Sequence, residues 1–302
     1  MMPSILDSLQ RIPLRRFWIF SDLQQSDPAN AFKCMRTGVS DFISLSLPID
    51  AICYLGDSTE GTDLTHLREM ADMQVAELAR VDAPVYYVMG NHEMDYHRHA
   101  DKYPELTLPM RERILREPKW HTTASPLDWA LTADFGEMSI ILLSDRCDPA
   151  EPSWVTSHCG IRKIDDVPQA DHDFTPDIGA IRKTLMATDK PAFTMSHYSF
   201  PGGNRDSEGP LQAELLPLPE AVVAHFYGHS HIGDMAWGRE NLFRQVSTVN
   251  GSRISQFDVA SLENRRGTAV RSAILEWYGG HSFGVFFRNH SDKSWEKVHL
   301  EN

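Results

Sequence analysis

Short apolar runs, each followed at once by polar side chains that can bind metals, are the feature that most restricts the fold of this chain. Five such runs occur, at residues 17–20, 51–55, 85–89, 192–195 and 224–227. They are rich in aromatic or β-branched residues and too short for helices, so they predict buried strands. Because parallel strands present their carboxyl ends along one edge of a sheet, we expect the polar side chains to converge there.

The polar residues that follow the runs are oxygen and imidazole donors. They are Asp22, Gln24, Asp57, Asn91, His197, His229 and His231. An aspartate between two cations can give one oxygen to each, which makes Asp57 the natural bridge. This donor mixture suits manganese, iron or zinc better than calcium. Two such ions, roughly 3.5 to 4 Å apart, can hold a phosphoryl group and lower the pKa of a bridging water, so the pattern predicts hydrolysis of a phosphate ester.

His92 directly follows one of these donors, Asn91, in the sequence Gly-Asn-His-Glu. A residue next to a ligand on a sharp turn generally points elsewhere and remains free to handle a proton. We therefore expect His92 to be the general acid that protonates the leaving-group oxygen.

Taken together, the blocks resemble the pattern of the calcineurin-like metallophosphoesterase superfamily, which reads D-x-H, G-D, G-N-H-E or G-N-H-D, a lone histidine and G-H-x-H. The matching residues, in the family's order, are Asp22, Asp57, Asn91, His92, His197, His229 and His231. The resemblance implies that Asp22 and His231 serve a first metal and that Asp57 bridges. It implies that Asn91, His197 and His229 serve a second.

Gln24 departs from this pattern, because it stands where the family has the histidine of D-x-H. An amide oxygen is a weaker and harder ligand than imidazole, so a first site with Gln24 as ligand should bind less tightly and favour manganese or iron. The alternative is that Gln24 only forms a hydrogen bond to a ligand.

The order of the remaining segments predicts an α/β fold. Ser26 or Asp27 can cap a helix that Pro28 opens, with Phe32 on its apolar face, and a second helix is expected over about 64–79. Later segments alternate as antiparallel hairpins, at 129–144 and 276–288. We expect two facing mixed β-sheets flanked by helices, a four-layer α/β/β/α sandwich that the resemblance also implies. Residues 1–302 then form a single domain.

Two insertions, at about 94–125 and 146–176, are expected near the active site. The first carries a basic cluster at residues 96–102, which either grips a phosphate or is a solvated loop. The second contains cysteine and histidine at irregular spacing, which does not favour a further metal site.

Charge and cysteine usage restrict partners and compartment. The net charge of −13 disfavours nucleic acid and anionic membranes as partners. The sequence contains no stretch of membrane-spanning length and no secretory signal. The four cysteines lack disulfide or zinc-finger spacing. These features predict a cytoplasmic protein with reduced thiols.

The predicted function is hydrolysis of a small phosphodiester or phosphomonoester, with the diester favoured, by a water activated at two divalent metals. The block at Asp57 lacks the Asp-Arg-Gly continuation of serine/threonine protein phosphatases, which disfavours that subclass. The alternative is a non-catalytic scaffold of the same fold that binds a protein partner. Gln24 is the residue that points to the scaffold.

Overall fold

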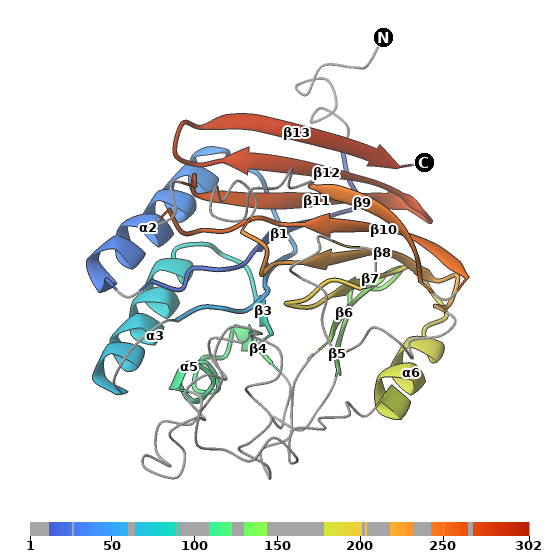
Figure 1. Ribbon diagram of the computed structural model, residues 1–302, viewed down its shortest axis with the longest axis horizontal. Helices are drawn as coiled ribbons and strands as arrows, with labels where there is room; N and C mark the ends of the chain where they lie inside the picture. Colours follow the sequence, from blue (N-terminus) through green and yellow to red (C-terminus); the bar gives the residue numbers. More distant parts are fainter. Residues whose placement is uncertain are drawn as a thin grey trace, which may run out of the picture.

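The computed structural model describes residues 12–25, 27–59, 64–88, 90, 109–122, 130–143, 178–200, 203, 218–231, 243–249, 251–264 and 268–301. In this part of the chain two β-sheets face one another and helices cover their outer faces (Figure 1). The first sheet contains seven strands, in the spatial order β13 (Ser294–Glu301), β12 (Ser282–Asn289), β11 (Arg271–Gly279), β1 (Arg15–Phe20), β2 (Ala51–Tyr54), β3 (Val85–Tyr87) and β4 (Trp120–His121).

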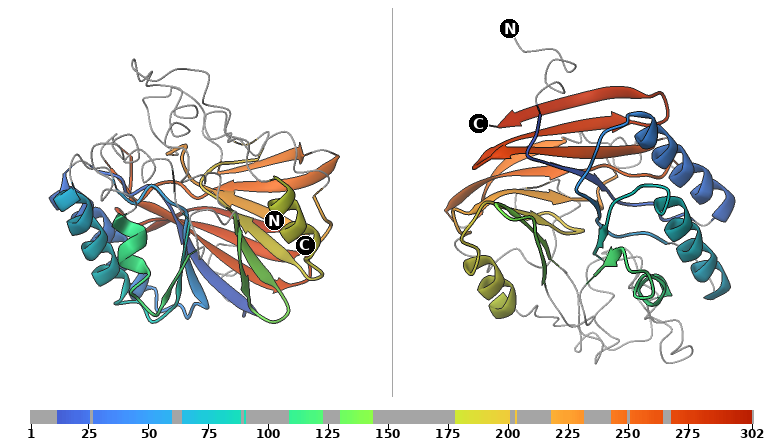
Figure 2. Two further views of the ribbon diagram at one scale, coloured as in Figure 1. Left: turned by 90° about the horizontal axis from the view of Figure 1, so that it is seen from below. Right: turned by 180° about the vertical axis from the view of Figure 1, so that it is seen from behind.

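The second sheet contains six strands among the described residues. Their spatial order is β5 (Ala130–Asp134), β6 (Ser139–Leu143), β7 (Ala192–Met195), β8 (Val222–Tyr227), β10 (Ser252–Asp258) and β9 (Arg244–Val249). The helices are α2 (Pro28–Ser44), α3 (Leu64–Leu78), α5 (Pro109–Ile114) and α6 (Ile178–Met186). Helices α2, α3 and α5 lie on the outer side of the first sheet and α6 on that of the second (Figure 2). The predicted four-layer sandwich is confirmed.

Alternation of side chains along the strands builds the three apolar layers between the four structural layers. In β1, Trp18 and Phe20 pack against the helices, whereas Phe17 and Ile19 fill the space between the sheets. In β6 the residues with odd numbers pack against α6 instead. Because successive side chains of a strand point to opposite faces, an unbroken apolar run is what a strand needs when both of its faces are buried.

Helix α2 begins as the sequence predicts. The side chain of Asp27 accepts a hydrogen bond from the backbone N–H of Ala29 at 3.0 Å, and Pro28 occupies the first helical turn. The expectation that Phe32 faces the core is wrong, since this side chain is 37% exposed. The neighbouring Ala31 lies on the buried stripe with Met35, so the phenyl ring falls outside it.

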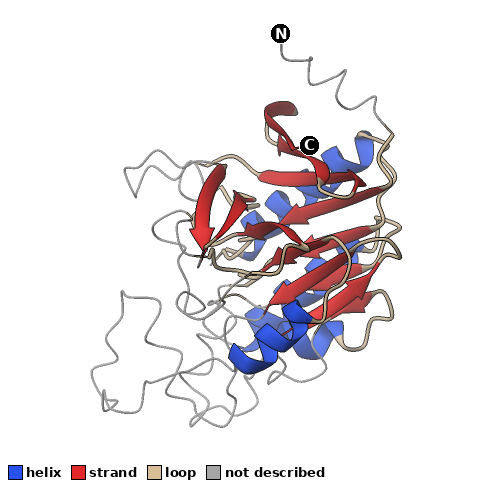
Figure 3. Ribbon diagram, turned by 90° about the vertical axis from the view of Figure 1, so that its right-hand side faces the viewer, coloured by secondary structure: helices blue, strands red, loops and turns tan. Residues whose placement is uncertain are grey.

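The strands expected before the donor blocks are present, but they belong to two sheets rather than one. Strands β1, β2 and β3 run parallel in the first sheet, and β7 and β8 run parallel in the second. Figure 3 shows the strands in red across the middle of the molecule, with the helices in blue packed against them. The two predicted hairpins correspond to β5 with β6 and to β11 with β12, both antiparallel. Strands β4, β10 and β13 and helix α6 were not predicted.

Of the two predicted insertions, 146–176 lies outside the described residues, and so does the basic cluster at 96–102. The described part of the first insertion contains α5 and β4, which extends the first sheet by pairing with β3. None of the described helices is both long and apolar enough to cross a lipid bilayer.

Candidate metal centre

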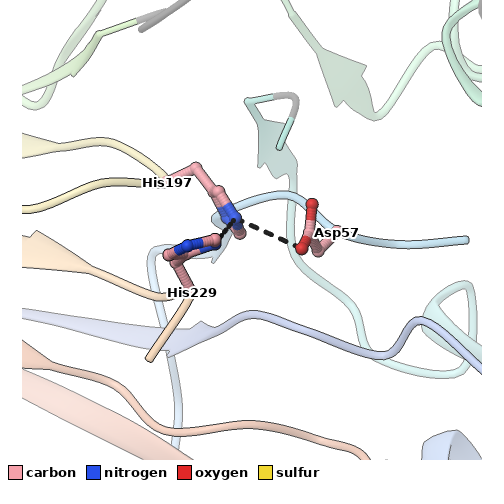
Figure 4. A group of neighbouring side chains, drawn as sticks. All are labelled: Asp57, His197 and His229. Carbon is pink, nitrogen blue, oxygen red and sulfur yellow. Dashed lines mark hydrogen bonds and ion pairs between the residues drawn. The ribbon is translucent and has the colours of Figure 1, made fainter. Parts of the chain in front are cut away.

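Five of the predicted donors meet where strands from both sheets end. Asp22 follows β1 and Asp57 follows β2, whereas His197 follows β7 and the pair His229 and His231 follows β8. They form two groups that share Asp57. One contains Asp57, His197 and His229, the other Asp22, Asp57 and His231, and within each group the candidate ligand atoms all lie within 4.8 Å of one another. Figure 4 shows the first group, with the two imidazoles directed toward each other and toward Asp57.

Backbone hydrogen bonds fix the loops that carry the two aspartates. The N–H of Asp22 donates to the carbonyl of Gly56 at 3.0 Å, and the N–H groups of Leu23 and Gln24 both donate to the carbonyl of Asp57 at 2.9 Å. The loops leaving β1 and β2 are therefore tied together at the point where their carboxylates emerge.

The orientation of the His197 ring follows from its hydrogen bond to Leu55. Its Nδ1 atom lies 2.7 Å from the carbonyl oxygen of Leu55, which can only accept, so Nδ1 carries a proton. The other nitrogen, Nε2, lies 3.3 Å from Oδ2 of Asp57 and 3.2 Å from Nδ1 of His229. The ring thus directs a nitrogen at the shared carboxylate, as a metal-binding imidazole does.

Asp22 connects the loop after β1 with the loop after β8. Its Oδ2 atom accepts a hydrogen bond from the backbone N–H of His229 at 2.9 Å. Its Oδ1 atom lies 3.4 Å from Nε2 of His231 and is buried without a hydrogen-bond partner among the described residues. A buried carboxylate oxygen in this state is costly unless a cation satisfies it.

Gln24 contacts His231 of the group that contains Asp22 and Asp57. Its Nε2 atom is 3.0 Å from Nε2 of His231, and its buried Oε1 atom has no hydrogen-bond partner in the part of the chain that the structure describes. The side chain therefore reaches the place where the family pattern has an imidazole. A half-turn of the amide would put its oxygen there.

The donors stand on backbone that few residue types adopt. Asp22, Asp57, His229 and His231 all have positive φ, at 59°, 52°, 67° and 47°. This left-handed conformation costs of order 1–3 kcal/mol for residues other than glycine and persists where the surrounding structure enforces it. Its concentration on four candidate ligands indicates that the loops are shaped for the site.

Two glycines let the loops approach the aspartates closely. A Cβ atom on Gly90 would lie 2.2 Å from Oδ1 of Asp57, and one on Gly228 would lie 2.1 Å from Oγ of Ser21. The glycines of the predicted motifs are therefore required by space at both positions.

The electrostatics of the pocket favour a cation. Burial raises the pKa of Asp22, because it penalises the carboxylate. Burial alone would lower the pKa of His197, but the carboxylates of Asp57 and Asp22 outweigh it and raise the pKa to about 10. A buried cluster that holds a proton this strongly would be stabilised by divalent cations, and its carboxylate, imidazole and amide donors fit manganese, iron or zinc.

Two predicted residues, Asn91 and His92, lie outside the described residues. A buried contact of the centre that was not predicted joins Oε1 of Glu263 to Nδ1 of His231, 2.8 Å apart. Glu263 follows Val259, Ala260, Ser261 and Leu262 after β10, and this short mixed segment gives no clear sequence signal for a contact with His231.

Comparisons with known proteins agree with this geometry. A family model described as calcineurin-like phosphoesterase matches residues 15–233. A dimetal phosphatase from Danio rerio has a similar structure, with a TM-score of 0.62 and 13% identity over 96% of this chain and 99% of its own. A purple acid phosphatase from yellow lupin (Lupinus luteus) seeds is similar with a TM-score of 0.58 and 14% identity over 95% of this chain, which spans 53% of the lupin protein. These identities show the fold alone. No curated protein matches the chain.

Proposed function

Because the chain belongs to the calcineurin-like phosphoesterase family, whose members hydrolyse phosphate esters with two metal ions, we propose that its substrate is a small phosphate ester and that a diester is preferred. The shared position of Asp57 carries the proposal. Its carboxylate belongs to both donor groups, whose other members are different residues. A pair of neighbouring cations requires a shared ligand of this kind.

The proposed roles follow from this arrangement. Asp22, Gln24 and His231 would hold a first divalent cation, and His197 and His229 would hold a second. Asp57, which belongs to both groups, would serve both cations, and Asn91 would complete the second site by its place in the motif.

When bound, the two cations supply charge neutralisation for the phosphoryl group and a lowered pKa for the attacking water. Asp57 offsets the repulsion between them. The hydrogen bond that Nδ1 of His197 donates to the carbonyl of Leu55 keeps the proton on Nδ1 and the Nε2 lone pair available. His92 delivers a proton to the leaving group as general acid.

The finer parts of the proposal rest on chemistry and composition. The amide at Gln24 favours manganese or iron over zinc at the first site. The net charge of −13 supports a small substrate rather than a nucleic acid strand. Cys34 and Cys53 are buried and free, which supports a reducing, cytoplasmic location.

The test is a panel of esters assayed with the metal-stripped protein before and after addition of Mn²⁺. We expect Mn²⁺-dependent hydrolysis, faster with bis-p-nitrophenyl phosphate than with p-nitrophenyl phosphate, and its loss in Asp57→Asn. A natural panel of cyclic nucleotides, nucleotide pyrophosphates and sugar phosphates then identifies the ester class. Absence of metal-dependent turnover on every ester would contradict the proposal and favour the scaffold that binds a protein partner.

The role of His92 has its own test. His92→Ala should lose rate while it retains both metal ions, because proton delivery does not require the side chain to bind metal. Loss of metal in this variant would instead make His92 a ligand.

A further inference from the structure

Glu263 is a fully buried carboxylate beyond the residues that the family model matches, and it contacts one of the candidate ligands. Its Oε1 atom lies 2.8 Å from Nδ1 of His231, whose Nε2 atom lies 3.4 Å from Oδ1 of Asp22. The imidazole is thus held between two carboxylates, one on each of its nitrogens.

The backbone holds Glu263 against the same loop that carries Asp22. The N–H of Glu263 donates to the carbonyl of Asp22 at 3.2 Å, and the N–H of Leu262 donates to the carbonyl of Ser21 at 3.0 Å. The hydroxyl of Thr268 donates to the carbonyl of Glu263 at 2.8 Å. Leu262 is itself buried in the apolar layer beneath α2. The fold therefore fixes the backbone from which the Glu263 side chain extends toward His231.

The contact selects which nitrogen of His231 faces the centre. The negative charge of a carboxylate 2.8 Å from Nδ1 favours a proton on that nitrogen, which leaves the lone pair on Nε2. On that side lie Asp22 and the amide of Gln24, whose Nε2 atom is 3.0 Å from Nε2 of His231. Glu263, His231 and Gln24 form one chain of contacts through the first candidate site.

We propose that Glu263 is the positioning residue of the first metal site: it orients His231, makes its Nε2 a stronger donor, and offsets the amide that stands in place of an imidazole at Gln24. The inference rests on the proposed function, since it requires His231 to bind metal. A carboxylate paired with a ligating imidazole fixes its orientation and raises its basicity, and loss of such a partner typically costs roughly 10- to 100-fold in metal affinity. The second site has no such dependence, because the carbonyl of Leu55 orients His197.

The experiment compares Glu263→Gln with the wild-type protein in Mn²⁺ titrations followed by electron paramagnetic resonance. The wild-type protein should bind two ions and give the spin-coupled signal of a manganese pair. Glu263→Gln should bind one ion with unchanged affinity and the other roughly 10- to 100-fold more weakly, so that the uncoupled signal dominates at two equivalents.

Glu276→Gln is the matched control. Glu276 is also fully buried and forms an ion pair with Arg16 at 2.6 Å, at the beginning of β1, whereas Asp22 follows the end of that strand. Its loss should destabilise the fold but leave both manganese affinities unchanged. Equal weakening in both variants would mean that Glu263 acts only through stability and would overturn the proposal.

A second measurement needs no substitution at Glu263. In zinc-loaded wild-type protein with ¹⁵N-labelled histidine, His231 should carry its proton on Nδ1 and its metal on Nε2. The signal is assigned by its absence in His231→Asn. A proton on Nε2 would overturn the proposal, even if Glu263→Gln failed to fold.

The outcomes separate this inference from the function on which it rests. If the wild-type protein binds no Mn²⁺ at all, the proposed function fails. If it binds two ions and hydrolyses esters, but Glu263→Gln binds both as tightly, only the role of Glu263 fails.

Discussion

Gly228→Ala adds a single methyl group and should abolish most of the activity of the candidate metal centre. The added Cβ would lie 2.1 Å from Oγ of Ser21 and 2.6 Å from Oδ2 of Asp22, whereas ordinary contacts of a Cβ lie at 3.4–4 Å. Both neighbours are fully buried, so they must move by about 1 Å within a packed interior. Overpacking of this kind costs about 1–3 kcal/mol. For a chain of this length, each kcal/mol lowers Tm by roughly 2 °C.

The effect on activity should exceed the effect on stability. Asp22 is the oxygen donor that the methyl group displaces, and a misplacement of about 1 Å can cost roughly 100-fold in rate. Ester hydrolysis and Mn²⁺ titration of Gly228→Ala should therefore show a rate at least about 100-fold lower and weakened binding of one ion.

The control is Gly251→Ala, where an added Cβ meets none of the described residues within 4 Å although φ is +91°. It should destabilise by about 1 kcal/mol through the left-handed backbone and retain full activity. A Gly228→Ala protein with wild-type rate and metal affinity would refute the placement of the loop after β8 against Asp22.

Three further predictions concern stability. Asp41 binds Arg288 through two hydrogen bonds, at 2.8 and 3.0 Å, and His290 through one at 2.8 Å. Asp41→Asn should lower the free energy of unfolding in urea by about 3–5 kcal/mol, because a buried guanidinium loses its counter-charge. A loss below about 1 kcal/mol would contradict this. Burial lowers the pKa of His225 to about 4, so in the metal-stripped protein this residue should contribute a loss of stability as the pH falls from 6.5 toward 4, about 2 kcal/mol at pH 5, since the unfolded chain takes up the proton first. The contribution is measured as the difference in pH dependence between the wild-type protein and His225→Gln, and equal pH dependence of the two would contradict it. Mn²⁺ at 100 times its Kd should raise the free energy of unfolding by about 2.7 kcal/mol for each site, and EDTA should reverse it; an unchanged Tm would contradict metal binding.

The strands that deliver the donors could be predicted because their signal is local. Each is a continuous apolar run that ends at a donor block, and both faces of such a strand are buried in the sandwich. Strand β10 escaped prediction because it is polar yet buried. Its Gln256 accepts a hydrogen bond from the backbone of Phe200 at 2.8 Å, and Asp258 accepts one from Ala260 at 3.0 Å. Such pairing makes polar side chains acceptable inside a protein but leaves no apolar pattern in the sequence.

Which residues would gather could also be predicted in large part, whereas the partners of the gathered residues could not. The motif spacing indicated that Asp57 and His229 meet, because each follows a strand that ends in the same region. Nothing in the spacing connects Glu263 with His231, or Leu55 with His197, since these contacts depend on how loops from different strands pass one another. The distribution of the strands between two sheets was likewise a property of the whole fold.

The origin of the donors in opposite sheets has a mechanical consequence. Asp57 extends from the first sheet and His197 from the second, and the apolar layer between the sheets sets their separation. A cation bound by both side chains would cross-link the two sheets of the sandwich. Large-to-small substitutions in this apolar layer, far from any donor, should therefore lower the metal affinity before they unfold the protein. Removal of the metal by a chelator should in turn make the two sheets easier to separate.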